Sequence, residues 1–319
     1  MAGDYFIGLD IGGSSIKGAA VSPEGNILTR SRRDTESKSS TSVIVDNISL
    51  LAEEIRESQG KDPIATGIGV PGAIQFEKGV VSRSPHFPHW MDYDLRSALS
   101  ERILSPIFID NDANCAALGE LWMGGGRGCS HFCLLTLGTG IGGGLILGGK
   151  IFRGVDGMAA EIGHIIVEPE GRPCGCGGRG CLEKYVSAHS AVETALELYE
   201  TEKAAVLRRN TEGGKERVTS KLLHDLAREG DPFCLELFQR MGRYLGMGFV
   251  DIIHIFNLER IIIGGGMMAS WDLLVPEAIR EMKSRAYKIP AERVEIAPAQ
   301  CGEDAGTLGA VFLAKGGKM

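Results

Sequence analysis

The sequence predicts an α/β protein of roughly two domains, and three observations support this prediction. The chain has 319 residues, about twice the length of a typical domain. Short apolar runs of strand length alternate with longer stretches whose apolar residues recur at helical spacing. The 45 glycines stand in short runs between apolar segments, which indicates tight turns and close backbone contacts.

Composition and charge narrow the class of protein. A hydrophobic fraction of 43% and a charged fraction of 24% are typical of a soluble globular protein. The net charge of −7 and the lack of a dense basic stretch argue against non-specific nucleic-acid binding. Neither a signal-peptide pattern nor an apolar run of about 18 residues is present. We therefore expect a cytoplasmic protein with no nucleic-acid or membrane partner.

The first glycine run follows an apolar strand at residues 5–9 and precedes a second strand-like run at 17–21. This order predicts a β-hairpin with Asp10, Gly12 and Gly13 near its turn. Backbone N–H groups of such a turn can face an anion, and the aspartate can hold a metal ion. An ordinary hairpin with an acidic turn is the alternative.

A second glycine run, 138–143, lies between strand-like runs at 131–137 and 144–147. It formally matches GxGxxG, but no helix follows it, so the sequence favours a second hairpin over a dinucleotide fingerprint. The two hairpins form a repeat, and two such hairpins facing each other can clasp a triphosphate between two lobes. A third run, Gly264–Gly266, follows the apolar strand 260–263 and can take the nucleoside end of the ligand.

An acidic segment joins a short strand at 106–109 to a helix at 113–122. Asn111 or Asp112 is a natural N-cap for that helix. A carboxylate at a strand-to-helix switch is also well placed to face a cleft. On spacing alone, capping and catalysis are both open for Asp112.

Cys174, Cys176 and Cys181 stand close together in a glycine-rich loop. With His164 they make the ligand set of a tetrahedral zinc site. A disulfide is the alternative, which a reducing cytosol disfavours, and a purely structural metal knuckle is the stronger rival. The other cysteines are expected to be small buried hydrophobic residues: Cys115, Cys129, Cys133, Cys234 and Cys301.

A zinc ion on one ring nitrogen of His164 would leave the other nitrogen for a substrate hydroxyl. Glu161 and Glu183 flank the same loop, so the metal would position two carboxylates as well. A sugar has hydroxyls in fixed directions, and it is the ligand that rewards several rigid acceptors.

Over essentially its whole length the chain resembles the ROK family of repressors, open reading frames and sugar kinases, and most closely the bacterial glucokinases within it. The segments that carry the resemblance are DIGGSSIK (10–17), GIGVPG (67–72), NDANCAALGE (111–120), LGTGIGGG (137–144), EIGH (161–164) and GRPCGCGGRGCLE (171–183). The resemblance implies an actin-like, hexokinase-type ATPase fold with two lobes around a cleft. The smaller lobe would comprise residues 1–110 and the C-terminal helix at about 303–319, and the larger lobe 111–302 with a zinc loop at 164–183.

The resemblance also implies transfer of the γ-phosphate of ATP to the 6-hydroxyl of glucose, with Asp112 as the catalytic base. The sugar-binding residues would be Gly72, Asn111, Asp112, Glu161, His164 and Glu183. The residues around the phosphates and Mg²⁺ would be Asp10, Gly12, Gly13, Ser14, Lys17, Gly138 and Thr139, with Gly264 and Gly265 nearer the adenosine. The ligands of a structural Zn²⁺ would be His164, Cys174, Cys176 and Cys181. Relatives of this kind are commonly dimers or tetramers, so a homodimer or homotetramer is expected.

Three positions depart from the family pattern. Ser14 stands for the usual threonine and keeps the hydroxyl, and Ala160 stands for the glycine that usually precedes the glutamate. His86 lies in a loop that usually reads Asn-Leu-Pro-Gly-Trp and borders the sugar site. Kinases of N-acetylglucosamine, N-acetylmannosamine, mannose, fructose and allose share these motifs, so another hexose is the first alternative.

Two further classes of protein are alternatives. Sugar-responsive ROK transcriptional regulators carry an added N-terminal helix-turn-helix, for which we expect no room before the first strand. An actin-like filament or chaperone ATPase would leave the cysteine loop and the NDAN segment without a purpose.

Overall fold

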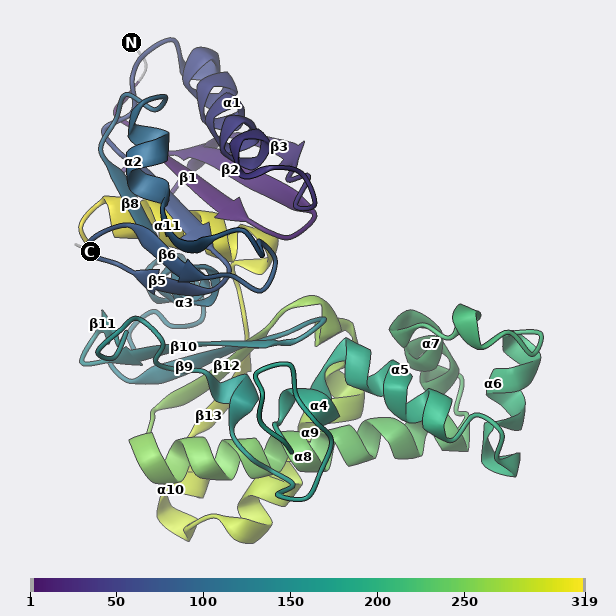
Figure 1. The fold of residues 1–319 in the computed structure, drawn as a ribbon. Helices are drawn as coiled ribbons and strands as arrows, with labels where there is room; N and C mark the ends of the chain where they lie inside the picture. The colour runs from purple at the N-terminus through teal and green to yellow at the C-terminus, as the bar shows by residue number, and fades with distance from the viewer. Residues whose placement is uncertain (1–2, 318–319) are drawn as a thin grey trace. The chain divides into compact units, whose positions relative to one another are not determined.

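The structure is a computed structural model and describes residues 3–317. The chain forms two compact units. The first comprises Met1–Leu134, Gly143–Ala160 and Ala299–Met319, and the second comprises Leu135–Gly142 and Glu161–Pro298. Figure 1 shows the helices and strands of both units. Within residues 3–317, no helix combines the length and the apolar composition needed to cross a membrane.

The elements follow the alternation of strands and helices that the sequence predicts. The strands are β1 (Phe6–Ile11), β2 (Ser15–Val21), β3 (Ile27–Asp34), β4 (Thr66–Val70), β5 (Ala73–Gln75), β6 (Val80–Arg83), β7 (Met91–Asp94), β8 (Ile107–Asn111), β9 (Phe132–Leu137), β10 (Ile141–Leu147), β11 (Lys150–Ile151), β12 (Arg260–Gly264) and β13 (Glu295–Pro298). The helices are α1 (Thr41–Gln59), α2 (Leu95–Ser100), α3 (Asp112–Met123), α4 (Glu183–Val186), α5 (Ala188–Glu197), α6 (Ala205–Asn210), α7 (Ser220–Arg228), α8 (Pro232–Phe256), α9 (Trp271–Arg285), α10 (Lys288–Arg293) and α11 (Ala305–Ala314). The 3₁₀ helix η1 (Ile162–His164) lies among them.

The first unit is built on a sheet of order β3-β2-β1-β4-β8. Its first three strands are antiparallel, and β4 and β8 continue in parallel. Side chains of a strand alternate between faces, so Ile7 and Leu9 join the buried core formed with α1. Gly8 faces the other way, toward α11, where an added Cβ would lie 2.2 Å from the Thr307 carbonyl oxygen. Glycine therefore lets α11 approach the sheet backbone closely.

The packing of α11 explains a difference from the expected lobes. A Cβ at Gly309 of α11 would lie 1.5 Å from the carbonyl oxygen of Cys115 in α3, so the two helix backbones are in close contact. The first unit accordingly includes α3 and extends to Leu134, whereas the sequence placed a lobe boundary after residue 110. The lobe boundary itself stays a prediction. The last two residues of the expected C-terminal helix lie outside the described residues.

A second sheet has the order β11-β10-β9-β12-β13. In both sheets the first strand in sequence stands in the middle, with its hairpin partners on one side and later strands on the other. This shared order agrees with the predicted repeat of two glycine hairpins. In the second unit the long α8 packs against α9, and Cβ atoms at Gly242 and Gly246 would lie 2.7 and 2.5 Å from carbonyl oxygens of that helix.

The sequence did not predict the small sheet β5-β6-β7 or the short helices α6 and α10. The strands of that sheet have three or four residues, and β7 is mostly exposed. Strands this short lack the alternating apolar pattern on which sequence reading depends. The loop between β6 and β7 contains His86, so the missed sheet also sets the position of a residue discussed below.

The carboxylate of Glu120, near the end of α3, is fully buried and held by backbone donors. It accepts hydrogen bonds from the N–H groups of Gly125 (2.6 Å), Gln300 (3.0 Å) and Cys301 (2.8 Å). One acidic side chain thus joins α3 to the segment that leads into α11.

We expect Glu120→Gln to lower the free energy of unfolding by about 1–3 kcal/mol, because an amide N–H₂ would face buried donors. Urea unfolding followed by circular dichroism measures this change. The matched control is Glu101→Gln, the same substitution at an exposed position. Equal unfolding midpoints for the two variants would contradict the prediction.

Candidate functional site

The sequence folds Asp112 into the first turn of α3, directly after β8. Asn111 is the N-cap, since its side chain accepts from the Asn114 N–H at 3.0 Å. Its amide nitrogen also donates to the Gly72 carbonyl oxygen at 3.0 Å. The structure therefore brings Gly72, Asn111 and Asp112, all predicted sugar-binding residues, together in the first unit.

The side chain of Asp110, the residue before Asn111, stabilises the junction between β8 and α3. It is 1% exposed and its carboxylate accepts from Arg153 Nε at 2.8 Å and from Asn114 Nδ2 at 3.1 Å. A buried charge needs such partners, and no local pattern in the sequence indicates that Arg153 would supply one. The ion pair fixes the backbone from which Asp112 projects.

The electrostatic environment of Asp112 suits a proton acceptor. Burial raises the pKa of Asp112 above its ordinary value, while the Ala113 N–H, which donates at 2.9 Å, and the charge of His86 lower it. Burial and the charge of Asp112 raise the pKa of Asp10 to about 6, with Lys17 opposing. Carboxyl groups with raised pKa values cluster at functional sites.

The predicted hairpin is confirmed as β1 and β2, with Asp10 opposite Lys17 and the Gly12 N–H bonded to the Ser15 carbonyl oxygen at 3.0 Å. Gly13 and Ser14 form its turn. Lys17 Nζ binds Glu303 Oε2 at 2.9 Å. The carboxylates of Asp10 and Asp112 repel each other. A divalent cation beside Asp10 would reduce this repulsion, so the position fits a metal ion in this one respect.

In the second unit, the side chains of His164, Cys174, Cys176 and Cys181 converge. Their ligand atoms all lie within 4.8 Å of one another. Cys174 Sγ is 3.6 Å from His164 Nδ1, and Cys176 Sγ is 3.6 Å from Cys181 Sγ. Neighbouring ligand atoms of a tetrahedral zinc site lie about 3.5–3.8 Å apart, given Zn–S bonds of about 2.3 Å and Zn–N bonds of about 2.0 Å. These four residues therefore fit a zinc ion.

Backbone hydrogen bonds shape the cysteine loop. The Gly178 N–H donates to Cys176 Sγ at 3.4 Å and holds the pKa of this thiol below its ordinary value. Burial raises the pKa of Cys181 to about 12. Gly180 has φ +75°, and a Cβ there would lie 1.7 Å from the Glu168 carbonyl oxygen. The loop thus requires glycine at this position.

Glu161, His164 and Glu183 all lie in the second unit, where the segments that carry them meet at Ile141. Glu183 Oε2 accepts from the Ile141 N–H at 2.9 Å, and Gly163 packs on the Ile141 carbonyl oxygen, 2.5 Å from the position of a Cβ. His164 Nε2 is 3.9 Å from Glu161 Oε2. Because Nδ1 faces the sulfurs, Nε2 is the ring nitrogen left for a ligand hydroxyl. Glu161 and His164 lie close to each other, and Gly163 and Glu183 both contact Ile141. That the side chains of Glu161, His164 and Glu183 together bind a sugar stays a prediction.

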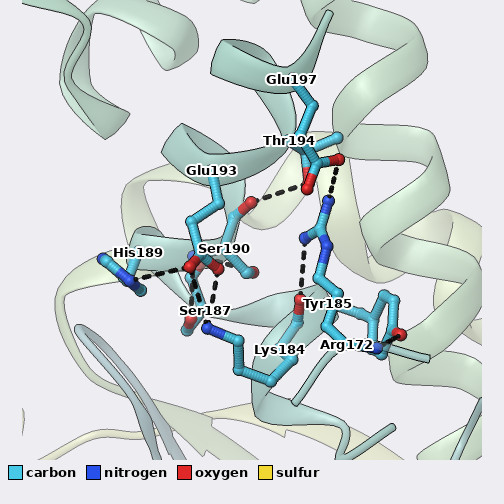
Figure 2. Close-up of polar contacts among 9 residues, drawn as sticks. All are labelled: Arg172, Lys184, Tyr185, Ser187, His189, Ser190, Glu193, Thr194 and Glu197. Carbon is cyan, nitrogen blue, oxygen red and sulfur yellow. Dashed lines mark hydrogen bonds and ion pairs between the residues drawn. The ribbon is translucent and has the colours of Figure 1, made fainter. Parts of the chain in front are cut away.

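The turn that carries Glu183 is tied to α5 by an ion-pair network that the sequence analysis missed (Figure 2). Arg172 Nη2 binds Glu197 at 2.6 Å and its Nη1 donates to the Lys184 carbonyl oxygen at 3.0 Å. Lys184 Nζ binds Glu193 at 2.8 Å. Burial tends to raise the pKa of Glu193, but the ion pair with Lys184 lowers it overall. The two glutamates are four residues apart on one face of α5, which is the sequence signal that could have revealed the network.

We expect Arg172→Met to lower the free energy of unfolding by about 1–3 kcal/mol, because it removes charged hydrogen bonds to a half-buried carbonyl and to Glu197. Thermal or urea unfolding measures the effect. Arg217→Met is the control, since its partner Glu212 is exposed and such pairs contribute within about 1 kcal/mol. A change no larger than that of the control would show that the network does not stabilise the loop.

The remaining predicted nucleotide residues also lie in the second unit. The Gly138 carbonyl oxygen accepts from the Ala188 N–H at the start of α5, at 2.8 Å. Gly265, with φ +92°, packs on the end of β9, where a Cβ would lie 2.3 Å from the Leu137 carbonyl oxygen. The glycine run after β12 therefore meets the loop that contains Gly138 and Thr139, and Gly264 ends β12 beside it.

The cysteines outside the cluster are buried in part as expected. All eight cysteines are free thiols, and Cys115, Cys133 and Cys234 are buried as expected, whereas Cys129 and Cys301 are only half-buried.

Ala160 has φ +64°, a left-handed conformation that glycine adopts more readily. The departure from the family glycine therefore places mild backbone strain next to Glu161.

The model of the ROK family matches residues 6–316. Glucokinase of Thermotoga maritima is 40% identical over 312 residues, covering 97% of this chain and 96% of that protein. The xylose repressor of Bacillus subtilis is 30% identical over 308 residues, covering 96% of this chain but 75% of the repressor.

Among solved structures, a ROK family glucokinase from Streptomyces griseus, crystallised with glucose and AMPPNP, is similar with a TM-score of 0.82 and 34% identity. The similarity covers 98% of this chain and 99% of that one. The fold is thus the α/β fold of ROK sugar kinases. Taken with the match over nearly all described residues, this similarity means that the chain belongs to the ROK family.

Proposed function

We propose that the protein is an ATP-dependent glucokinase, which transfers the γ-phosphate of ATP to the 6-hydroxyl of glucose. The observation that carries the proposal is the half-buried Asp112 at the start of α3, with its pKa raised by burial, in the same unit as the glycine hairpin. The glucokinases to which the chain is similar over nearly its full length support the choice of substrate. The actin-like, hexokinase-type architecture is part of the same proposal.

Asp112 accepts the proton of the attacking hydroxyl, because a carboxylate with a raised pKa is the stronger base. Asn111 donates a hydrogen bond to the Gly72 carbonyl oxygen, and these two residues orient the sugar beside Asp112. In the second unit, His164 Nε2, Glu161 and Glu183 accept or donate hydrogen bonds to other hydroxyls. Phosphoryl transfer depends mainly on such positioning and on charge neutralisation.

The N–H groups around Gly12, Gly13 and Ser14 receive phosphate oxygens, with Lys17 close by. Asp10 would hold Mg²⁺, which neutralises phosphate charge when bound. Gly138 and Thr139 receive further phosphate oxygens, and Gly264 and Gly265 lie nearer the adenosine. Zn²⁺ would be held by His164 and the three cysteines, where it stiffens the loop between Glu161 and Glu183.

The experiment that tests this proposal is an ADP-release assay with glucose, N-acetylglucosamine, N-acetylmannosamine, mannose, fructose and allose. We expect the highest kcat/KM with glucose. A higher value with another hexose would make the protein a different sugar kinase, and ADP release independent of any sugar would reject the kinase.

The similarity to xylose repressors makes a regulator the second candidate. Those repressors are longer than the matched region. A DNA-shift assay with fragments of the protein's own genomic neighbourhood decides the matter: sugar-dependent binding without ADP release would favour the regulator.

A further inference from the structure

The loop between β6 and β7 is held firmly by two aromatic side chains. Phe87 and Trp90 are 1% and 0% exposed, and their ring centroids are 4.5 Å apart. The backbone N–H of Trp90 donates to the Phe87 carbonyl oxygen at 2.9 Å. His86 precedes this turn and is exposed. The anchored turn therefore presents an exposed imidazole from a fixed base.

The start of the loop lies beside the predicted base. Gly72 has φ +124°, and a Cβ there would lie 2.2 Å from the Arg83 carbonyl oxygen and 2.9 Å from Ser84 Cα. The Gly72 carbonyl oxygen accepts from Asn111, the residue that precedes Asp112. The loop that carries His86 is thus joined through Gly72 to the start of α3.

The ring of His86 lies over the turn of the β1–β2 hairpin. A Cβ at Gly13 would lie 3.0 Å from His86 Nδ1, 3.2 Å from Cγ and 3.5 Å from Cε1. A Cβ at this position would crowd the imidazole, so glycine lets the ring pack closely on the turn. His86 is also close enough to Asp112 for its charge to act on that carboxyl. One imidazole therefore packs over the predicted phosphate turn, and its charge acts on the predicted proton acceptor.

We propose that His86 contacts the γ-phosphoryl group of the bound nucleoside triphosphate and stabilises its charge during transfer. The proposal rests on the proposed function, in which the hairpin holds the phosphates and Asp112 is the base. As the bond from γ-phosphorus to the sugar oxygen forms, the bond to the β-phosphate oxygen breaks and its electron pair stays on ADP. The hydroxyl proton goes to Asp112. An imidazole N–H donates a hydrogen bond to a phosphoryl oxygen, and a protonated ring adds charge.

The rival explanation is that His86 only packs on Gly13 and stabilises the hairpin. The two explanations differ in one measurable respect. A contact to the γ-phosphoryl group favours a triphosphate over a diphosphate, whereas a packing role affects the binding of both alike. The ratio of the affinities for a non-hydrolysable ATP analogue and for ADP therefore separates them.

The experiment compares His86→Ala and His86→Asn with His89→Asn, a change at the other exposed histidine of the loop. Calorimetric titrations with the ATP analogue and with ADP are made without sugar, and kcat is measured with the best hexose. For His86→Ala we expect a kcat about 10- to 100-fold lower and a loss of affinity for the analogue but not for ADP. Asparagine keeps a donor near the Nδ1 position, so His86→Asn should recover part of both, and His89→Asn should change neither.

Equal losses for the analogue and ADP, or unchanged kcat and affinities in His86→Ala, would overturn the proposal. A wild-type protein that phosphorylates no hexose would reject the proposed function instead. Because the titrations require no sugar, the affinity ratio still decides the role of His86 in that case.

Discussion

Asp112→Asn is expected to lower kcat with glucose at least about 100-fold while leaving the dissociation constant for glucose close to that of the wild type. Asparagine keeps the oxygen that accepts from the Ala113 N–H at 2.9 Å, so the first turn of α3 is preserved. What it loses is the capacity to take the hydroxyl proton. Initial rates and calorimetric glucose titrations measure the two quantities separately.

The control is Asp46→Asn, the same change at an exposed carboxylate on α1. It should alter neither kcat nor glucose binding. Turnover of Asp112→Asn within a few fold of the wild type would remove Asp112 as the base, and the proton acceptor would have to be sought among other groups.

The direction in which kcat/KM changes with pH follows from the raised pKa of Asp112. A base works only when ionised, so kcat/KM should fall with decreasing pH at a value above the ordinary aspartate pKa of about 3.9. For stability the sign is opposite: the folded state favours the protonated form. That contribution is fully present below about pH 4 and is lost as pH rises through the folded-state pKa. Asp112→Asn should therefore be at least as stable as the wild type at neutral pH.

Local signals in the sequence predicted the central strands and the start of α3. The run from Tyr5 to Leu9, the glycine turn and the Asn111 cap are each decided by neighbours in the chain. The strands β5 to β7 could not be predicted, because their pairing with one another, rather than their side-chain pattern, makes them strands. The close contact of α3 with α11 depends on residues such as Cys115 and Gly309, which are far apart in the chain.

The candidate site likewise contains some residues that the sequence predicts and others that only the structure reveals. The cluster of His164 with three cysteines was predictable, since all four lie in one short segment with glycines between them. The contact of His86 with Gly13 and the ion pair of Arg153 with Asp110 join distant segments. No spacing rule in a single sequence reveals such pairs, because tertiary packing alone brings them together.

Cys176→Ser is expected to remove bound zinc and to weaken glucose binding by about 10- to 100-fold. The four ligand atoms lie within 4.8 Å of one another, and replacing a thiolate by a hydroxyl removes the soft ligand that zinc prefers. Cys176 is exposed, so the substitution disturbs little packing. Zinc content by mass spectrometry and glucose affinity by calorimetry are measured on the same preparation.

Loss of the metal would act on the predicted sugar-binding residues through the chain itself. His164 would supply one ligand and lies three residues after Glu161, while Cys181 lies two residues before Glu183. Glu183 is held at Ile141 and the Arg172 network ties its turn to α5, so part of the structure should survive without zinc. Affinity should therefore fall in Cys176→Ser while kcat at saturating glucose changes little. Cys129→Ser, the same change at a half-buried thiol outside the cluster, is the control. Zinc-free Cys176→Ser with wild-type glucose affinity would show that the metal does not order these carboxylates, and that the hydrogen bonds of Ile141 and Arg172 suffice.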